Sequence, residues 1–206
     1  MDLFNTDESS GTTIHTFDLP DADIVFYKHF FTNHQSDELF GKLKENIRWQ
    51  QDKIKLYGKI IDLPRLTAWY GGKAYGYSGI TMPVHPFTDE LLLIKSAIEK
   101  AADVKFTGVL LNYYRNGNDS VSWHSDDEKE LGKNPIIASV SFGATRTFQL
   151  RHKTRKDLEK PAVSLSHGSL LLMKGSTQHF WEHQVPKISK PTGPRINLTF
   201  RNIQSN

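Results

Sequence analysis

The sequence predicts a mainly β domain of the α+β class, in which two helices near the N-terminus precede a β-sandwich or jelly roll. Two observations support this prediction. Apolar residues recur twice at helical spacing before residue 107, and short apolar segments separated by Gly, Pro, Asn or Ser follow that point. A chain of 206 residues is long enough for one compact domain with a substantial core.

The first predicted helix begins near Thr32, because Thr32 and Gln35 have the spacing of a capping box and Ser36 offers a second cap. Its apolar stripe consists of Leu39, Phe40, Leu43 and Ile47. The second helix is predicted after Thr88, with a stripe formed by Leu91, Ile94, Ile98 and Ala101. We expect both helices to pack against one outer face of the β core.

Six later segments have the composition of strands: 107–114, 136–142, 145–151, 169–174, 179–185 and 194–203. The charged tract at 151–160 is interpreted as a solvated hairpin, with a loop that grips a nucleic-acid strand as the alternative. Residues 1–20 are polar and aperiodic, which predicts a flexible leader. Residues 21–206 are then expected to form a single domain.

The composition excludes several classes of protein. There are no cysteines, so disulfides, iron–sulfur clusters and thiolate zinc sites are excluded, and His and carboxylates remain as the strong metal ligands. No apolar run approaches the roughly 20 residues that span a membrane, and the N-terminus resembles neither a secretory nor a transit peptide. We therefore expect an intracellular protein, cytoplasmic or nuclear if eukaryotic. The formal charge of +3 weakly favours a polyanionic partner.

Three residues form a candidate metal site. His124 and Asp126 lie two positions apart, so on an extended segment both side chains leave the same face. That spacing alone is common by chance. His183, on a later strand, completes a set of two histidines and one carboxylate, the facial triad that binds non-haem Fe(II) with coordination positions left open.

The last predicted strand offers a site for an anion. Arg195, Asn197 and Arg201 alternate with apolar residues, so both guanidiniums lie on one face. Buried cations need compensating anions, and a dicarboxylate suits them because a guanidinium binds a carboxylate through two hydrogen bonds. The alternative is an exposed strand face with solvated arginines. Asn112 and Tyr114 share a face of an earlier strand and are candidate neutral donors to the same carboxylate, or ordinary core residues.

These residues and their surroundings resemble the AlkB family of nucleobase-repair dioxygenases, especially its animal homologues acting on DNA and RNA. The likeness runs from about residue 30 to 203. Its most specific segments are PRLTAWYG at 64–71, DSVSWHSDDE at 119–128, IIASVSFGATRTF at 136–148, HGSLLLM at 167–173 and PRINLTFR at 194–201.

The resemblance implies a double-stranded β-helix form of the jelly roll at 107–206, with helices and a nucleotide-recognition lid at 21–106. Fe(II) would bind His124, Asp126 and His183. The distal carboxylate of 2-oxoglutarate would bind Asn112, Tyr114, Arg195 and Asn197. Arg201 would neighbour the iron-proximal carboxylate, and is therefore grouped with the catalytic residues. Tyr75, Tyr77 and Glu128 would surround a flipped base, although loop aromatics and a surface glutamate remain the alternative.

The implied activity is O2-dependent oxidative demethylation of 1-methyladenine and 3-methylcytosine in alkylated DNA, single- or double-stranded, and in RNA. The reaction would consume 2-oxoglutarate and release succinate and formaldehyde, and we expect a monomer. Two rival functions remain: a 2-oxoglutarate-dependent hydroxylase of a protein or small molecule, and a non-enzymatic nucleic-acid-binding jelly roll with a structural metal.

One segment departs from the best-matching homologue. The central motifs match the homologue that acts on single strands, whereas KLYGK at 55–59 matches the sibling that acts on duplexes. We hypothesise that Leu56 and Tyr57 form a finger that wedges into the base stack. The alternative is a hairpin turn whose apolar residues cover the core.

Overall fold

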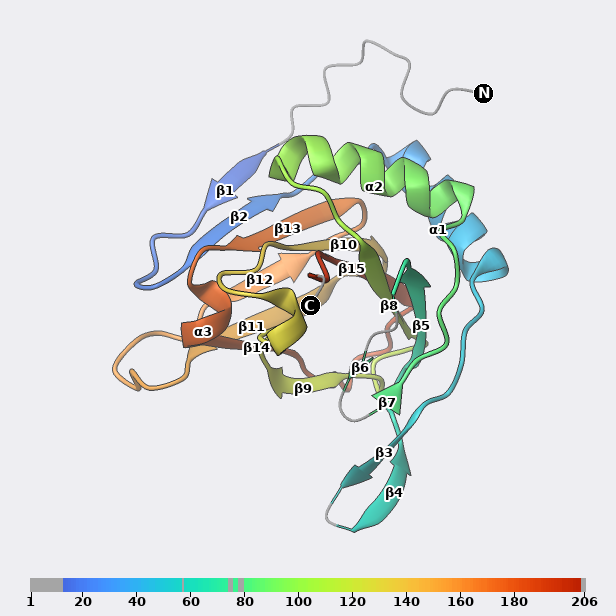
Figure 1. The fold of residues 1–206 in the computed structure, drawn as a ribbon. Helices are drawn as coiled ribbons and strands as arrows, with labels where there is room; N and C mark the ends of the chain where they lie inside the picture. The colour runs from blue at the N-terminus through green and yellow to red at the C-terminus, as the bar shows by residue number, and fades with distance from the viewer. Residues whose placement is uncertain (1–12, 57, 74–75, 78–79, 205–206) are drawn as a thin grey trace.

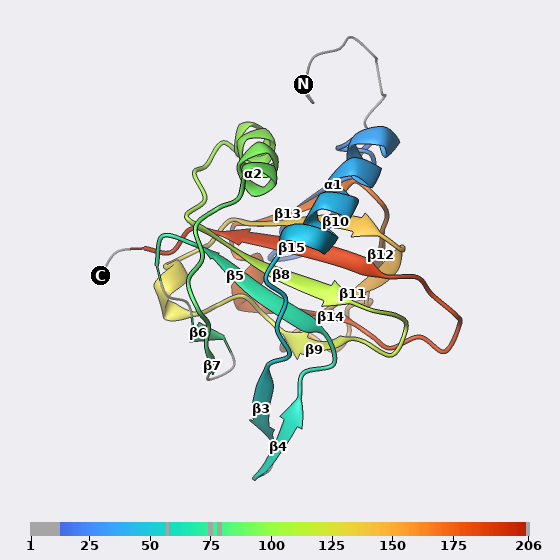
Figure 2. The same ribbon diagram turned by 90° about the vertical axis from the view of Figure 1, so that its right-hand side faces the viewer.

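The molecule consists of two antiparallel sheets that face each other, with two helices on the outer side of the larger sheet (Figures 1 and 2). The computed structural model describes residues 13–56, 58–73, 76–77 and 80–204; at 55–56, 76–77 and 80–81 the description is limited to the backbone. Among the described residues strands hold about twice as many residues as helices, and the antiparallel sheets match the predicted jelly roll.

The larger sheet has seven strands in the order β1 (Ile14–Thr16), β2 (Asp23–Tyr27), β13 (Ser169–Lys174), β10 (Ile137–Gly143), β15 (Arg195–Arg201), β8 (Gly108–Tyr114) and β5 (Leu66–Gly71). The smaller sheet has four, in the order β12 (Ala162–Leu165), β11 (Arg146–His152), β14 (Trp181–Val185) and β9 (Val121–His124). Two separate pairs are β3 (Lys53–Leu56) with β4 (Lys59–Asp62), and β6 (Gly76–Tyr77) with β7 (Ile80–Thr81).

Both main helices begin at the caps that the sequence predicts. α1 (Asn33–Asn46) has a complete capping box: the backbone N–H of Gln35 donates to the Thr32 hydroxyl at 3.2 Å, and the Thr32 N–H donates to the Gln35 side chain at 3.0 Å. α2 (Asp89–Ala102) begins after Thr88, whose hydroxyl caps its first turn. A 3₁₀ turn, η1 (Lys129–Leu131), and a short helix, α3 (Thr177–Phe180), were not predicted.

The larger sheet separates two hydrophobic clusters, one on each face. The outer cluster joins the apolar stripes of α1 and α2 to side chains such as Leu111, Val140 and Leu198. The inner cluster joins Leu110 and Leu171 of the larger sheet to residues of the smaller sheet. Because neighbouring residues of one strand face opposite ways, Leu110 and Leu111 belong to different clusters. Each such buried aliphatic side chain contributes roughly 1.5–3 kcal/mol to stability.

β15 is an interior strand of the larger sheet, between β10 and β8, and all seven of its residues are buried. Ile196, Leu198 and Phe200 point into the outer cluster. The remaining side chains point toward the smaller sheet; they are Arg195, Asn197, Thr199 and Arg201. One interior strand therefore supplies both part of the core and one wall of a polar pocket.

The bounds of the β core also differ from the prediction. Residues 14–16, inside the predicted leader, form β1 and pair with β2, whereas residues 1–12 lie outside the described residues. β2 and β5 precede residue 107 but belong to the larger sheet, so the β core begins earlier in the chain than predicted. His179 and Phe180 belong to α3, because the chain makes one helical turn before β14 starts.

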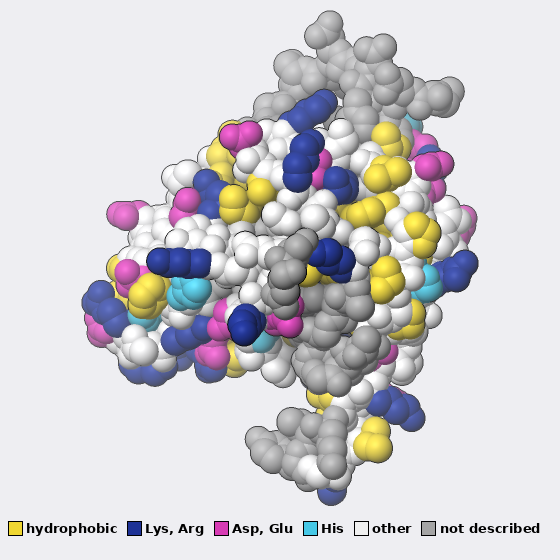
Figure 3. All heavy atoms as spheres, in the orientation of Figure 1, with side chains coloured by type: hydrophobic (Ala, Val, Ile, Leu, Met, Phe, Trp, Pro, Cys, Tyr) yellow, Lys and Arg dark blue, Asp and Glu magenta, His cyan; other side chains and the backbone are white. Residues whose placement is uncertain are grey.

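The charged connection between β11 and β12 is a surface loop, as predicted. Residues 154–157 are exposed, and Arg155 pairs with Asp157 at 2.6 Å. Lys and Arg side chains are visible on this side of the molecule at the left of Figure 3, mixed with acidic ones. Among the described residues no helix is both long and apolar enough to cross a membrane.

Candidate metal and cofactor site

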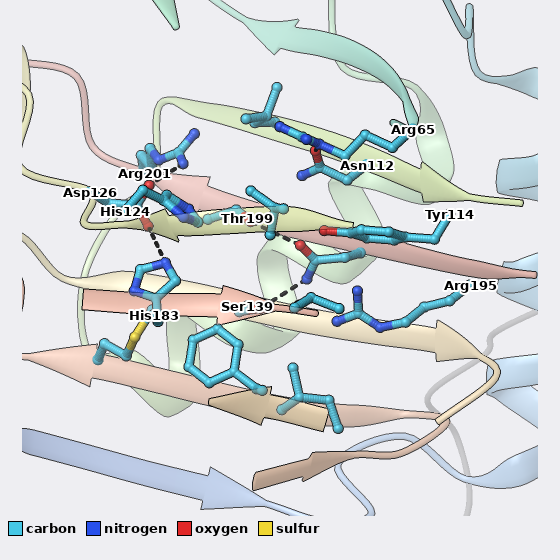
Figure 4. A pocket seen from close by; sticks show the side chains of 17 residues that line it. Arg65, Asn112, Tyr114, His124, Asp126, Ser139, His183, Arg195, Thr199 and Arg201 are labelled. Carbon is cyan, nitrogen blue, oxygen red and sulfur yellow. Dashed lines mark hydrogen bonds and ion pairs between the residues drawn. The ribbon is translucent and has the colours of Figure 1, made fainter. Parts of the chain in front are cut away.

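A pocket between the two sheets brings together the three predicted metal ligands. His124 ends β9, His183 lies on β14, and the two are directly paired across the smaller sheet. Each of His124, Asp126 and His183 offers one ligand atom, and these atoms lie within 4.8 Å of one another. Figure 4 shows the three side chains converging at one end of the pocket, so segments about 60 residues apart in sequence meet at one point.

Asp126 does not lie on the strand that carries His124. β9 ends at His124, and Asp126 follows in a segment without regular structure. The two side chains do meet at one point, but they do not leave one face of a shared strand, because the strand ends at His124. The position of Asp126 is set by contacts with more distant residues.

Neighbouring groups orient both histidine rings. The Nδ1 of His124 lies 2.8 Å from the Ser122 carbonyl oxygen; since a carbonyl only accepts, Nδ1 donates this hydrogen bond, and Nε2 is the nitrogen left to face a metal. The ring of His183 stacks on Phe148 with centroids 4.9 Å apart. Burial and the nearby His124 lower the pKa of His183 to about 3, against an opposing effect of Asp126. His183 is therefore neutral at neutral pH.

The carboxylate of Asp126 is ionised and oriented by two neighbours. Burial raises the pKa of Asp126, but the positive charge of Arg201, together with the neighbouring histidines, outweighs burial, and the pKa lies at about 2. Oδ1 accepts a hydrogen bond from the Arg201 guanidinium, and Oδ2 lies 3.8 Å from Nε2 of His183. The donor set thus consists of two imidazoles and one carboxylate, which suits a divalent iron.

The opposite end of the pocket is cationic. Arg195 is 1% exposed, and its NH2 group donates to the Ser141 hydroxyl at 3.0 Å. Among the described residues, no hydrogen-bond partner reaches its buried Nε and NH1 groups, and its guanidinium lies 5.0 Å from the centroid of the Tyr114 ring. Burial lowers the pKa of Arg195 to about 10, so it stays charged at neutral pH. A buried guanidinium with unused donors is a suitable partner for a carboxylate.

The strand register brings the other predicted cofactor residues beside Arg195. Tyr114 of β8 is paired with Arg195 of β15, and Asn112 is paired with Asn197. All four side chains line the pocket. The Asn197 amide donates to the Ser139 hydroxyl at 2.8 Å and to the Val140 carbonyl at 3.0 Å. In Figure 4 Tyr114 and Arg195 lie at the end away from the histidines, so the pocket has a metal end and a cationic end.

Three buried residues that sequence reasoning did not single out support this site. Arg65 lines the pocket, and its Nε donates to Oδ1 of Asn112 at 2.6 Å. Gln178 contacts Asp126, as described below, and Arg146 packs over the Tyr114 ring at 5.6 Å. Arg65 is the arginine of the motif PRLTAWYG, but nothing local in the sequence indicates that its side chain is buried.

The substrate residues are described only in part. Tyr75 and Tyr57 lie outside the described residues, and for Tyr77 and Leu56 the description covers the backbone in β6 and β3. Glu128 is half-buried, directly precedes η1 and is not among the described residues that line the pocket. Their predicted contacts with a base stay predictions.

A loop tied by Asp119 supports the cationic end of the pocket. The Asp119 carboxylate accepts hydrogen bonds from the Arg115 backbone N–H at 2.9 Å and from the Arg115 Nε at 2.7 Å. The buried Arg146 donates to the carbonyl oxygens of Asn116, Asp119 and Pro186. Arg146 thereby joins this loop to the segment that precedes β15.

We expect Asp119→Asn to lower the free energy of unfolding by roughly 1 kcal/mol at pH 7, because the neutral amide weakens the charge-assisted hydrogen bonds that Arg115 donates to the buried carboxylate. Burial raises the pKa of Asp119, but the hydrogen bonds from Arg115 outweigh burial and hold it below 3.8. The contribution of a carboxyl with a lowered pKa is present above pH 3.8 and is lost as the pH falls below that value. Urea unfolding at pH 7 and pH 3 should give a smaller difference from wild type at pH 3; an equal difference would contradict the ion-pair explanation.

A family model described as "2OG-Fe(II) oxygenase superfamily" matches residues 23–201, so the chain belongs to this superfamily. The family implies Fe(II), 2-oxoglutarate and O2, and the donor sets at the two ends of the pocket fit the first two. Within the superfamily the similar proteins are AlkB homologues, which confirms the resemblance seen in the sequence motifs.

The chain is 45% identical over 177 residues to alpha-ketoglutarate-dependent dioxygenase alkB homolog 3 from Bos taurus, a match that covers 82% of this chain and 62% of that protein. It is 36% identical over 188 residues to DNA oxidative demethylase ALKBH2 from Mus musculus, covering 86% of this chain and 79% of that protein. The chain thus spans less than two thirds of the bovine relative. A solved chain described as "The structure of OsALKBH1" matches with a TM-score of 0.64 at 17% identity, covering 92% of this chain and all of that one, and supports the fold.

Proposed function

We propose that this chain oxidatively demethylates N-alkylated bases, of the 1-methyladenine and 3-methylcytosine type, in DNA and RNA. The observation that carries the proposal is one pocket with His124, Asp126 and His183 at one end and the uncompensated guanidinium of Arg195 at the other. The names of similar proteins, which include a DNA oxidative demethylase, support nucleic acid as the substrate. We also propose that residues 21–206 form one domain and act as a monomer, since one chain supplies every group named here.

In this proposal His124, Asp126 and His183 hold Fe(II), and 2-oxoglutarate lies between the iron and Arg195. When bound, Fe(II) and 2-oxoglutarate supply the O2-dependent oxidation of the N-methyl group, which yields succinate, CO2 and formaldehyde. Arg195 and Tyr114 bind the distal carboxylate and so fix the direction of the co-substrate in the pocket. Arg201 keeps Asp126 ionised and in place beside the proximal end.

The base must leave the stack to reach a pocket between two sheets. Flipping costs a few kcal/mol, and less where methylation has already broken the pairing, so the cost itself favours damaged bases. We propose that Tyr75, Tyr77 and Glu128 receive the flipped base.

The test is a demethylation assay on matched single- and double-stranded DNA and RNA, each with one 1-methyladenine, with formaldehyde as the measured product. Formaldehyde should form only with Fe(II) and 2-oxoglutarate present. Turnover of 2-oxoglutarate without base repair would favour a hydroxylase of a protein or small molecule. Absence of both reactions, with folded metal-bound protein, would favour a binding protein.

We further propose that the β3–β4 hairpin opens duplexes. It projects from the body of the molecule in both ribbon views, and its tip contains Gly58 with φ at 78°, a conformation that favours glycine in a tight turn. Ile60 is 72% exposed, so at least this apolar residue does not cover the core. An exposed apolar side chain on a projecting hairpin supports insertion between base pairs.

Replacing Leu56 and Tyr57 together by alanine should reduce repair of double-stranded DNA while repair of single strands remains near wild type. The measurement is the ratio of initial rates on the two substrates. Leu92→Ala, which truncates an exposed leucine of α2 on the outer side of the larger sheet, is the control. Equal loss on both substrates would contradict the wedge.

A further inference from the structure

The backbone of Asp126 is fixed by one buried side chain. Its N–H donates to the Oε1 of Gln178 at 2.8 Å, and both residues are 1% exposed. Because a backbone N–H can only donate, the amide oxygen must face Asp126, and the amide nitrogen then faces the sulfur of Met173 at 3.4 Å. The orientation of the Gln178 amide follows from these two neighbours.

This hydrogen bond lies where the sheet has ended. Strand pairing between β9 and β14 reaches His124 and His183, and Asp126 is two residues beyond it. A residue in the ladder takes its backbone position from strand pairing, whereas Asp126 requires another partner. The side chain of Gln178 occupies the place of that partner.

Gln178 is itself tied to the segment that leads into the other ligand. It lies in α3, directly before the strand that carries His183. The Thr177 hydroxyl donates to the Lys174 carbonyl at 2.6 Å and accepts from the Asp23 N–H at 2.9 Å, which anchors this turn to the larger sheet. Gln178 therefore holds Asp126 relative to a fixed turn only five residues from His183.

A second link joins the same two segments on the solvent side. The Nζ of Lys153 donates to the Gln178 carbonyl oxygen at 2.9 Å and to Oδ2 of Asp127 at 2.9 Å. Asp127 follows Asp126 directly, so backbone and side chain of Gln178 both lead to the segment that carries the metal ligand. Movement of Asp126 and Asp127 away from α3 would break the Asp126–Gln178 and the Lys153–Asp127 hydrogen bonds together.

We propose that Gln178 is a positioning residue of the metal centre, which holds Asp126 so that one carboxylate oxygen faces the histidines while Arg201 binds the other. This inference rests on the ligand roles proposed above. Residues that orient metal ligands commonly change metal affinity by roughly 10- to 100-fold when replaced. Gln178 acts through the backbone of a ligand, and it is not among the described residues that line the pocket.

The test measures binding of Mn(II) alone, without O2 or nucleic acid, from the loss of the free Mn(II) signal in electron paramagnetic resonance. Gln178→Leu removes the acceptor and should weaken Mn(II) binding by roughly 10- to 100-fold. Gln178→Glu keeps an acceptor oxygen at the same reach and should bind Mn(II) more nearly as wild type does. The matched control is Gln184→Leu. Gln184 lies on β14 beside His183, but its side chain hydrogen-bonds Gln149 on the face of the smaller sheet that is turned away from the pocket.

Wild-type affinity in Gln178→Leu, or an equal loss in Gln178→Glu, would overturn the inference and leave the proposed function intact. A wild-type protein that binds no Mn(II) would overturn the ligand roles and this inference together. If Gln178→Leu does not fold, Gln178→Asn makes the same test, because it stays polar and shortens the side chain by one methylene. Weaker Mn(II) binding by the asparagine variant, with an unchanged control, would support the inference.

Discussion

Asp126→Ala is expected to remove Mn(II) binding, with an affinity at least roughly 100-fold below wild type, and to abolish demethylation. The variant loses a metal ligand and also breaks the buried ion pair with Arg201, in which both side chains are 2% exposed. Leaving one buried charge unpaired costs about 3–5 kcal/mol. We therefore expect a lower free energy of unfolding in the metal-free protein, measured by urea denaturation.

A second variant separates these two effects. In Asp126→Ala combined with Arg201→Met, the uncompensated guanidinium is gone, so much of the lost stability should return while Mn(II) binding stays absent. Mn(II) binding that survives in the single variant would show that Asp126 is not a ligand. A double variant as unstable as the single one would show that the unpaired charge is not the cause of the instability.

Arg195→Met is expected to weaken binding of 2-oxoglutarate while leaving the co-substrate-free protein as stable as wild type, or more stable. The guanidinium is buried, and two of its donors have no partner in the part of the chain that the structure describes, so an apolar side chain of similar length removes an unfavourable charge. Losing one partner of a buried ion pair costs about 2–5 kcal/mol of binding free energy, or roughly 30-fold or more in affinity. Calorimetric titration of the Mn(II)-loaded protein with 2-oxoglutarate measures this loss.

Arg146→Met provides the matched control. Arg146 is equally buried and also lies over the Tyr114 ring, but its guanidinium is bound by three carbonyl oxygens. Its loss should therefore destabilise the fold. If Arg195→Met lowers stability as much as Arg146→Met, or leaves the affinity for 2-oxoglutarate unchanged, Arg195 does not serve as the carboxylate-binding residue.

The elements that the sequence predicts well are those with local causes. The cap at Thr32 and the stripe after Thr88 depend on residues three or four positions apart, and both helices begin where these features indicate. The alternation in β15 likewise predicts which side chains share a face. His124 and His183 could be paired only by chemistry and by the family resemblance, since they are 59 positions apart.

The features that the sequence did not predict have distant causes. β2 and β5 join the larger sheet because of partners far along the chain, which their own composition does not specify. Gln178 and Asp126 are 52 residues apart, and a glutamine before a strand has no local feature that indicates a buried hydrogen bond. The backbone position of Asp126, beyond the end of β9, could not be predicted for the same reason. A tertiary contact with Gln178 sets it, and strand geometry does not.

The two chemically different faces of β15 also restrict how the protein can fold. A one-residue slip of this interior strand against β8 or β10 would turn Arg195 and Arg201 into the hydrocarbon layer beneath the helices and turn Ile196, Leu198 and Phe200 toward the pocket. Such an error would be penalised on both faces together. Correct alignment of β15 therefore places the guanidinium of Arg195 in the pocket and, in the same folding step, completes the hydrophobic cluster beneath the two helices.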